Sequence, residues 1–141
     1  MIVLDTNVIS ELMRSRPEPN VLRFVDRYDR REVRTTAISV AEVRLGIALL
    51  PVGRRRSQLA ESFDELLTTF LRNRVLPVDE HTGSPYARIG ARRAERGRPI
   101  TMADALIAAI CIQHDAALAS RNTSDFEMTG IRVLDPWTES A

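Results

Sequence analysis

Five short apolar segments of strand character alternate with longer helical segments along the whole chain. This alternation restricts the fold, because strands separated by helices pair in parallel and their connecting helices cover both faces of the sheet. We therefore predict an α/β fold with a central, mostly parallel five-stranded sheet flanked by helices on both faces. The predicted strands are Ile2–Leu4, Val33–Ile38, Val75–Val78, Ala116–Ala119 and Ile131–Leu134.

Helical segments fill the intervals between these strands. Apolar residues at helical spacing identify them, and proline or glycine residues mark several of their ends. A length of 141 residues suits one compact domain. Because neither a repeat nor a linker interrupts the pattern, we expect residues 1–141 to form a single domain. The predicted helices are Val8–Met13, Asn20–Tyr28, Ser39–Leu50, Ser57–Phe70, Asp79–Arg96 and Thr101–Gln113.

All 20 basic residues are arginine, and the chain contains no lysine. This excludes a Walker A phosphate loop and a Schiff-base lysine, and it disfavours a phosphorelay receiver domain. A GC-rich coding sequence would also produce this usage. The single cysteine, Cys111, lies in an apolar stretch and is expected to be a buried thiol. Without a basic leader or a long apolar run, the chain is expected to be soluble and cytoplasmic, with no membrane partner.

Five acidic or amide side chains follow the predicted strands or begin the helices that connect them. Asp5 follows the first strand, Glu42 lies in the first turn of the helix after the second, and Asp104 opens the helix that precedes the fourth. Asn122 and Asp125 follow the fourth strand. Ligand sites of parallel sheets lie beyond the carboxyl ends of the strands. We therefore expect these side chains to converge on that edge.

Local structural roles are the alternative for each of these residues. Ser39–Glu42 and Thr101–Asp104 both fit a capping box, and Asp5 could be a helix N-cap or form an Asx turn. Several carboxylates on one partly buried edge would nevertheless repel one another, and a divalent cation would relieve that cost. Oxygen ligands favour Mg²⁺, with Mn²⁺ as a second choice. The chemistry such an ion supports is phosphodiester hydrolysis.

The sequence around these residues resembles the PIN-domain toxins of the VapC family, in particular their FitB-like branch. The resemblance covers the whole chain and rests on four motifs in order, together with the ending Val133–Trp137. The motifs are Met1-Ile-Val-Leu-Asp5-Thr-Asn-Val-Ile-Ser-Glu-Leu12, Ser39-Val-Ala-Glu42-Val-Arg-Leu-Gly46, Asp104-Ala-Leu-Ile-Ala-Ala109 and Ala119-Ser-Arg-Asn-Thr-Ser-Asp-Phe126.

The resemblance implies a PIN domain that acts as an Mg²⁺-dependent endoribonuclease, the toxin of a type II toxin–antitoxin pair. By position, Asp5, Glu42 and Asp104 would be the catalytic, metal-binding carboxylates, with Thr6 as a polar neighbour. Asn122 or Asp125 would fill a fourth position, and which of the two does so stays open. The implied partners are an RNA substrate, a VapB-like antitoxin and a second copy in a homodimer, with operator DNA reached only through the antitoxin.

Two other functions compete with a nuclease. The chain could be a non-catalytic partner in a DNA-bound repressor complex, with a vestigial acidic pocket. A phosphatase of the dehalogenase class is disfavoured, because Asp5-Thr6-Asn7 replaces the Asp-x-Asp motif that such enzymes carry. The only histidines, His81 and His114, lack a catalytic partner pattern and are expected to be structural or surface residues.

Positive charge is concentrated in the first part of the chain. Residues 1–100 hold 18 Arg and 13 acidic residues, whereas residues 101–141 hold two Arg and six acidic residues. The clusters Arg54–Arg56 and Arg88–Arg98 could be solvated helix faces or could guide a polyanion to the acidic edge. Apolar helix surface beyond the needs of one sheet could form a groove for an antitoxin segment or a dimer face.

Overall fold

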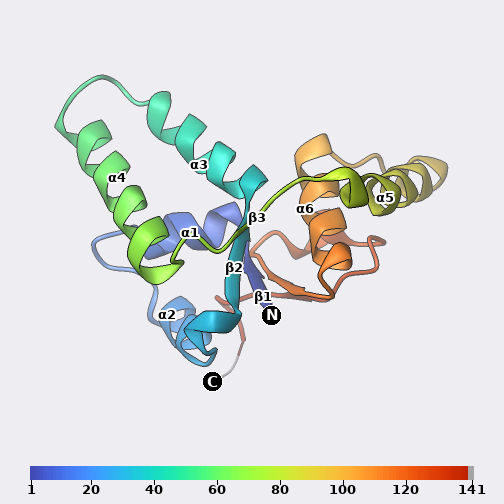
Figure 1. Ribbon diagram of the computed structural model, residues 1–141, viewed down its shortest axis with the longest axis horizontal. Coiled ribbons are helices and arrows are strands. Elements are labelled where there is room, and N and C mark those ends of the chain that lie inside the picture. Colours follow the sequence, from blue (N-terminus) through green and yellow to red (C-terminus); the bar gives the residue numbers. More distant parts are fainter. Residues whose placement is uncertain (140–141) are drawn as a thin grey trace.

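The computed structural model describes residues 1–139 and contains one five-stranded sheet in which every neighbouring pair of strands is parallel. The strand order β3-β2-β1-β4-β5 places β1 at the centre (Figure 1). The predicted parallel α/β sheet is confirmed. Four of the predicted strands are shorter in the structure than in the prediction, and the bounds are β1 Ile2–Leu4, β2 Val33–Thr36, β3 Val75–Leu76, β4 Ala117–Ala119 and β5 Val133–Leu134.

Helices lie on both sides of this sheet, as the alternation predicts. In Figure 1, α1, α2 and α4 lie to the left of the strands, and α5 and α6 lie to the right. Helix α3 contacts α1, α4 and α6 and so connects the two groups. The α-helices are α1 Thr6–Leu12, α2 Pro19–Asp26, α3 Ala37–Ala48, α4 Arg54–Glu65, α5 Gly83–Glu95 and α6 Met102–Gln113; shorter turns are η1 Arg30–Glu32, η2 Leu66–Phe70, η3 Glu80–Thr82 and η4 Thr123–Phe126.

The alternation of side chains along β1 divides the core into two clusters. Ile2 and Leu4 pack with the apolar faces of α1, α2 and α3, whereas Val3 packs with α5 and α6 on the other face. All three side chains are at most 1% exposed. Since a strand turns successive side chains to opposite faces, one three-residue strand anchors both halves of the core.

The starts of α1 and α3 differ from the predicted ones, and both differences have a local cause. Asp5 has extended backbone angles and its carboxylate accepts from the amide of Thr6, so α1 begins at Thr6 rather than Val8. Thr36 caps α3, with its hydroxyl accepting from the Ser39 amide at 3.1 Å. The capping-box alternative for Ser39–Glu42 is therefore wrong, and the Glu42 side chain is available for another contact.

The predicted helix Ser57–Phe70 begins earlier and changes geometry partway. Helix α4 covers Arg54–Glu65, and the turn η2 over Leu66–Phe70 is a π-helix. The hydroxyls of Thr68 and Thr69 donate to the carbonyls of Asp64 and Glu65 at 2.9 and 2.6 Å. Such side-chain bonds compete with the regular ladder and favour the wider turn. The predicted helix Asp79–Arg96 likewise divides into η3 and α5.

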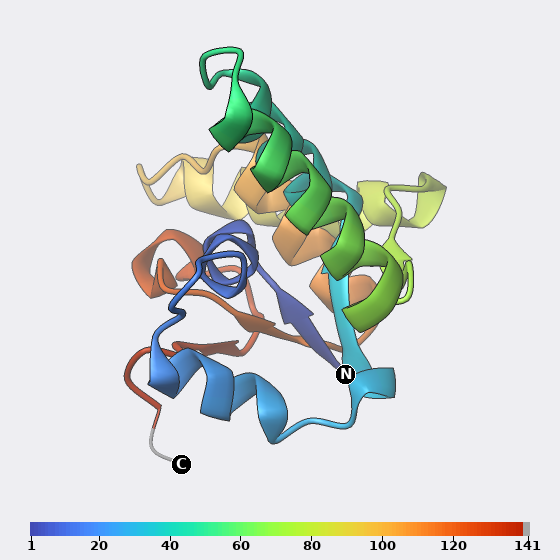
Figure 2. The same ribbon diagram turned by 90° about the vertical axis from the view of Figure 1, so that its left-hand side faces the viewer.

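Helices α3 and α4 form a hairpin that extends away from the sheet. Figure 2 shows α4 crossing in front of α3, above α1 and α2. Only Phe63 of α4 is fully buried, so this hairpin has much of its surface in solvent. No helix among residues 1–139 is long and apolar enough to cross a membrane.

Candidate active site

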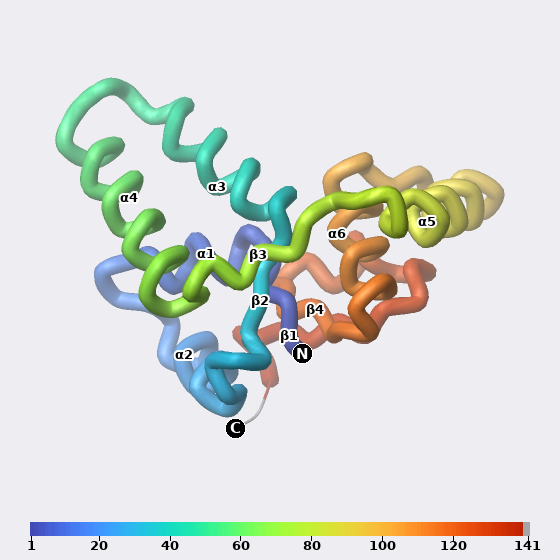
Figure 3. The backbone as a smooth tube through the Cα atoms, in the orientation of Figure 1, coloured from blue at the N-terminus to red at the C-terminus, as the bar shows by residue number. Residues whose placement is uncertain are grey.

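Asp5 occupies the carboxyl end of the central strand, where the edge predicted from the sequence lies. Its backbone amide continues the sheet by donating to the carbonyl of Ala119, at the end of β4. Figure 3 shows β1 and β4 side by side. The residue is only 5% exposed. Burial raises the pKa of its carboxyl group above the usual value, and the nearby charge of Glu42 adds to the rise.

Two side chains from opposite ends of the chain hold the Asp5 carboxylate. The hydroxyl of Ser120 donates to Oδ2 at 2.7 Å, and the amide nitrogen of Asn7 approaches the same oxygen at 3.4 Å. Asn7 also donates to Ser120 Oγ and accepts from the Arg121 backbone. Neither Asn7 nor Ser120 is among the site residues predicted from the sequence. The sequence signal that could have identified these two residues is their position near the acidic residues, shortly after the ends of β1 and β4.

Glu42 reaches the same edge from the first turns of α3. Its Oε1 accepts a 2.7 Å hydrogen bond from the Thr6 hydroxyl, although the side chain is exposed. Thr6 directly follows Asp5, so this bond places the two carboxylates beside each other. The sequence prediction of Thr6 as a polar neighbour of the acidic residues thus corresponds to a specific contact.

Asp104 lies in the first turn of α6 and is partly buried. Its backbone amide donates to the hydroxyl of Thr101, the N-cap of the helix, so the capping role considered for Thr101 is present. Burial raises the pKa of the Asp104 carboxyl group, and repulsion from Asp5, Asp125 and Glu42 adds to the effect. Asp5, Asp125 and Glu42 therefore lie close enough for their charges to act on the Asp104 carboxyl group.

Asn122 and Asp125, the two candidates for the fourth position of the acidic site, have different surroundings. The charge of Asp125, in η4, acts on the Asp104 carboxyl group. Asn122 is exposed and contributes its backbone amide, which donates to Ser120 Oγ at 3.1 Å. Asn122 therefore helps to orient the residue that holds Asp5, whereas Asp125 adds negative charge.

The donor chemistry of this edge fits a hard divalent cation. None of Asp5, Glu42, Asp104 and Asp125 forms an ion pair with an arginine in residues 1–139. Their mutual repulsion is thus left without a cationic partner, which is the condition that a bound cation relieves. Within the same residues, no three His, Cys, Asp or Glu side chains form a ready-made metal-ligand group.

Cys111 is a buried thiol in the last turn of α6. It is fully buried in α6, and burial, with a smaller contribution from the charge of Asp5, raises its pKa to about 12. Such a thiol stays protonated at neutral pH. Cys111 therefore supplies no thiolate to the site.

Comparison with known proteins gives the family. The family profile described as PIN domain matches residues 2–130. The chain belongs to the PIN-domain family. It is 39% identical over 137 residues to Toxin FitB of Neisseria gonorrhoeae, a match that covers 97% of this chain and 99% of FitB. It is also 39% identical to VapC ribonuclease Y4jK of Sinorhizobium fredii, over 97% of this chain and 98% of that protein.

A solved structure agrees with these sequence relatives. The structure of FitAB bound to an IR36 DNA fragment superposes on this chain with a TM-score of 0.90 at 38% identity, covering 100% of this chain and 99% of that chain. The resemblance to the FitB-like branch of the VapC family is confirmed.

A groove of about 1260 Å³ adjoins the carboxylate edge of this PIN domain. Thr6, Asn7 and Glu42 form its end beside Asp5, and Arg121 and Trp137 also line it. Its walls come from α1, α3 and α4, with an apolar part formed by Val43, Ile47, Leu50 and Leu59. The groove therefore joins an apolar surface to the acidic site.

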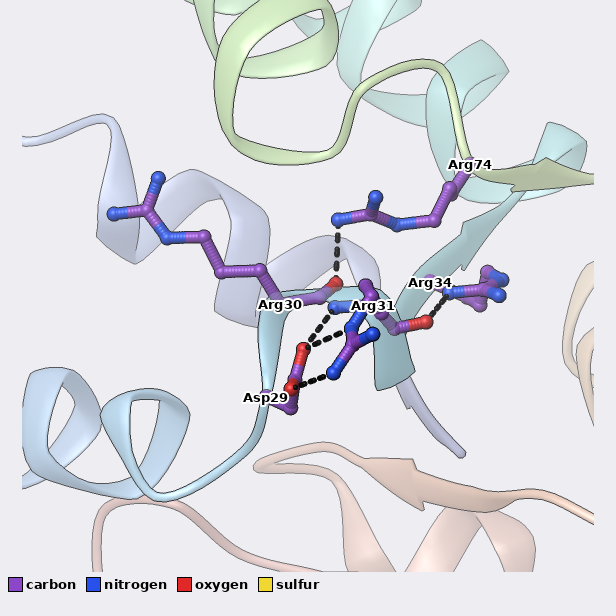
Figure 4. A network of polar contacts seen from close by, with 5 residues as sticks. All are labelled: Asp29, Arg30, Arg31, Arg34 and Arg74. Carbon is purple, nitrogen blue, oxygen red and sulfur yellow. Dashed lines mark hydrogen bonds and ion pairs between the residues drawn. The ribbon is translucent and has the colours of Figure 1, made fainter.

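Several arginines of the PIN domain serve the structure rather than a ligand. Arg74 donates to the carbonyl of Arg30, and Arg34 donates to the carbonyl of Arg31 (Figure 4). Arg74 also donates to the carbonyls of Val33 and Phe70. Arg31 pairs with Asp29 at 2.8 Å. These residues surround the start of β2, whereas Asp5 lies at the opposite edge of the sheet.

The two arginine clusters predicted to guide a polyanion also divide by environment. In the cluster Arg88–Arg98, Arg93 is buried and Arg98 pairs with Glu127 at 2.8 Å. In the cluster Arg54–Arg56, Arg55 lines the groove. Only part of the predicted basic surface is therefore available to a ligand at the acidic edge.

Proposed function

We propose that this PIN domain is the toxin of a type II toxin–antitoxin system and acts as an Mg²⁺-dependent endoribonuclease. The observation that carries the proposal is the set of unpaired carboxylates at the end of β1, in a chain 39% identical to a VapC ribonuclease. An active site of carboxylates without a nucleophilic lysine, cysteine or histidine suits hydrolysis assisted by a divalent cation.

Asp5, Asp104 and Glu42 are the residues we assign to the metal ion, with Asp125 in the fourth position and Asn122 as a supporting residue. Bound there, Mg²⁺ or Mn²⁺ would supply polarisation of a phosphoryl oxygen and a lowered pKa of water. Asp5 presents a carboxylate whose orientation Ser120, Thr6 and Asn7 fix.

Glu42 has a second task in this proposal, besides its place among the metal-binding carboxylates. It is exposed and held by a single hydrogen bond from Thr6, so it is free to turn toward the attacking water. Hydrolysis then joins the water oxygen to phosphorus and breaks the bond to the 3′ oxygen. The expected products end in a 5′-phosphate and a 3′-hydroxyl.

The apolar part of the groove is the surface that we assign to the antitoxin. FitB, the relative described above, occurs in a complex named FitAB that is bound to DNA, so we propose a VapB-like partner that alone contacts operator DNA. Exposed apolar residues continue beyond the groove on α3, where Leu45 and Leu49 are 59% and 76% exposed. We assign this extension to a homodimer contact. The proposed place of action is the cytoplasm, where RNA is available.

Cleavage of defined RNAs by the purified protein tests this function. We expect single-stranded RNA to be cut in Mg²⁺, and not in EDTA. The Asp104→Asn variant should lose at least about a hundredfold in rate while keeping the wild-type circular dichroism spectrum. Glu80→Gln, an exposed acid outside the site, is the matched control and should cleave at the wild-type rate.

The alternative function, a non-catalytic partner in a DNA-bound repressor complex, predicts a different result. In that case the wild-type protein, tested with Mg²⁺ or Mn²⁺, leaves all RNAs intact. Activity that persists unchanged in both EDTA and Asp104→Asn would contradict the metal-dependent mechanism.

A further inference from the structure

We propose that Arg121, stacked on Trp137, is the residue that binds an RNA phosphate beside the carboxylate edge. This inference rests on the proposed nuclease function and adds to it the group that holds the substrate. Arg121 and Trp137 line the same groove as Thr6, Asn7 and Glu42. The guanidinium carbon of Arg121 lies 4.8 Å from the centroid of the Trp137 ring.

Negative charge at the site creates the need for such a residue. The charges of Asp5, Glu42 and Asp125 act on Asp104 at this edge, and a polyanionic substrate must approach these carboxylates. A cation close to the reacting phosphate offsets this repulsion. Arg121 is one of only two arginines in residues 101–141, a stretch that otherwise carries six acidic residues. Arg121 is therefore a positively charged side chain in a part of the chain that is mostly acidic.

The arginine is fixed to the site at its backbone. The Arg121 amide donates to Asn7 Oδ1 at 3.1 Å, and the side-chain nitrogen of Asn7 approaches the Asp5 carboxylate. One side chain, Asn7, thus connects the arginine to the buried aspartate. Any ligand group that Arg121 holds will therefore have a defined position relative to Asp5.

Trp137 provides the surface on which the guanidinium lies. The Asn20 side chain donates to the Trp137 carbonyl at 3.0 Å, and the Trp137 amide donates to Asp135 at 2.9 Å. The ring also packs against the core cluster of α1 and α2. The backbone of Trp137 is therefore fixed on both sides and its ring is packed on the core, so the residue gives the arginine a fixed support.

The chemistry of a stacked guanidinium favours a phosphate ligand. Stacking uses the flat face of the group and leaves its N–H donors free in the plane, where they match two phosphate oxygens. Arg121 is exposed and, within residues 1–139, forms no ion pair with a carboxylate. Arg14, another arginine of the groove, is by contrast paired with Glu11 at 3.3 Å.

RNA binding without cleavage tests the proposal separately from catalysis. The probe is a fluorescein-labelled single-stranded RNA of 12 nucleotides and mixed sequence, titrated with protein in EDTA and followed by fluorescence anisotropy. We expect Arg121→Gln to weaken binding about tenfold at low salt. The slope of log affinity against log salt concentration should fall by about 0.7, the value for one lost phosphate contact on a single strand.

Arg132→Gln is the matched control. Arg132 is the other arginine of the acidic stretch, it is exposed, and it precedes β5 at the opposite edge of the sheet. This variant should bind RNA within about twofold of wild type. Trp137→Phe keeps a ring for stacking and should retain most of the affinity, whereas Trp137→Leu should lose affinity at an unchanged net charge.

The inference is overturned if Arg121→Gln and Arg132→Gln change affinity and salt slope equally, or if the wild-type protein does not bind the RNA. Neither result decides the nuclease function, because the cleavage test does not depend on the role of Arg121. Conversely, loss of RNA affinity in Arg121→Gln, with cleavage absent from the wild type, would support the phosphate contact and reject the nuclease. A melting temperature measured for each variant ensures that only folded proteins are compared.

Discussion

The hydroxyl of Ser120 donates a 2.7 Å hydrogen bond to the carboxylate of Asp5, although the two residues are 115 positions apart. The parallel pairing of β1 with β4 creates this contact, because it aligns Leu4 with Ala119 and so brings the following residues together. The orientation of the Asp5 carboxylate, at the end of β1, thus depends on the neighbouring strand β4. Five predictions follow from this and related contacts.

Replacing Ser120 with alanine should impair catalysis more than folding. The Ser120 hydrogen bond lowers the pKa of Asp5 against the effect of burial, so its loss should raise that pKa further. We expect kcat to fall about tenfold and the acidic limb of the pH–rate profile to move to higher pH. Ser124→Ala, at an exposed serine of η4, is the control. An unchanged pH profile in Ser120→Ala would contradict this role.

Stability in EDTA should depend on pH through Asp5. Because the folded-state pKa lies above the usual 3.8, the folded protein binds more protons than the unfolded chain above that pH. The free energy of unfolding should therefore fall as the pH rises from about 4 through the folded-state pKa. Urea unfolding at pH 4 to 7 should show this fall in the wild type and a smaller one in Asp5→Asn. An equal decline of the free energy of unfolding in the wild type and in Asp5→Asn would contradict this role of Asp5.

The Thr6 hydroxyl should affect Glu42 without contributing much to folding. Thr6→Val keeps the shape of the side chain and removes the 2.7 Å hydrogen bond to Glu42. We expect RNA cleavage to fall about fivefold to tenfold and the melting temperature to change little, because the bond is exposed. Thr6→Ser retains a hydroxyl and should restore most of the activity. Equal rates for the valine and serine variants would show that the hydrogen bond has no catalytic effect.

The N-cap of α3 can be separated from Glu42 by mutation. Thr36→Val removes the oxygen that accepts from the buried Ser39 amide, and should lower the free energy of unfolding by about 1–2 kcal/mol. Glu42→Gln should leave it within about 0.5 kcal/mol of wild type. Chemical denaturation measures both values. A larger loss in Glu42→Gln than in Thr36→Val would favour the capping box that the structure does not contain.

Arg93 should be the most important arginine for stability. Its buried guanidinium donates to the carbonyls of Arg98, Asp125 and Glu127 at 2.7 to 3.0 Å. Arg93→Met leaves these acceptors without a donor and should cost about 2–4 kcal/mol. Arg88→Met, on the exposed surface of the same helix, should cost less than about 0.5 kcal/mol. Similar melting temperatures for the two variants would contradict this difference.

The sequence alone was sufficient to predict the strands, the parallel sheet and the edge on which the acidic residues meet. Those features depend on local periodicity and on the rule that parallel strands end at the same edge. Asp5 is predicted as a site residue in this way, because an acidic residue that directly follows an apolar strand lies at that edge of the sheet. Glu42 and Asp104 were recognised from their places in the first turns of two helices.

Contacts between distant segments were beyond sequence reasoning. The order of the strands determines that Ser120, and not a residue after β3 or β5, lies against Asp5, and local pattern does not specify that order. Glu42 was considered as a capping residue because Ser39 suited a cap, yet Thr36 takes that role three residues earlier. Arg121 and Trp137 are 16 positions apart, and only the path of the chain after β4 brings them into contact.

The central position of β1 has a consequence for the synthesis of this protein. Its first strand and its aspartate leave the ribosome early, but β4 and Ser120, which complete the surroundings of Asp5, come more than a hundred residues later. A growing chain therefore carries an unfinished site until most of the domain has emerged. Translation that stops before residue 117 leaves β1 without β4, and Asp5 then lacks the hydrogen bond from Ser120.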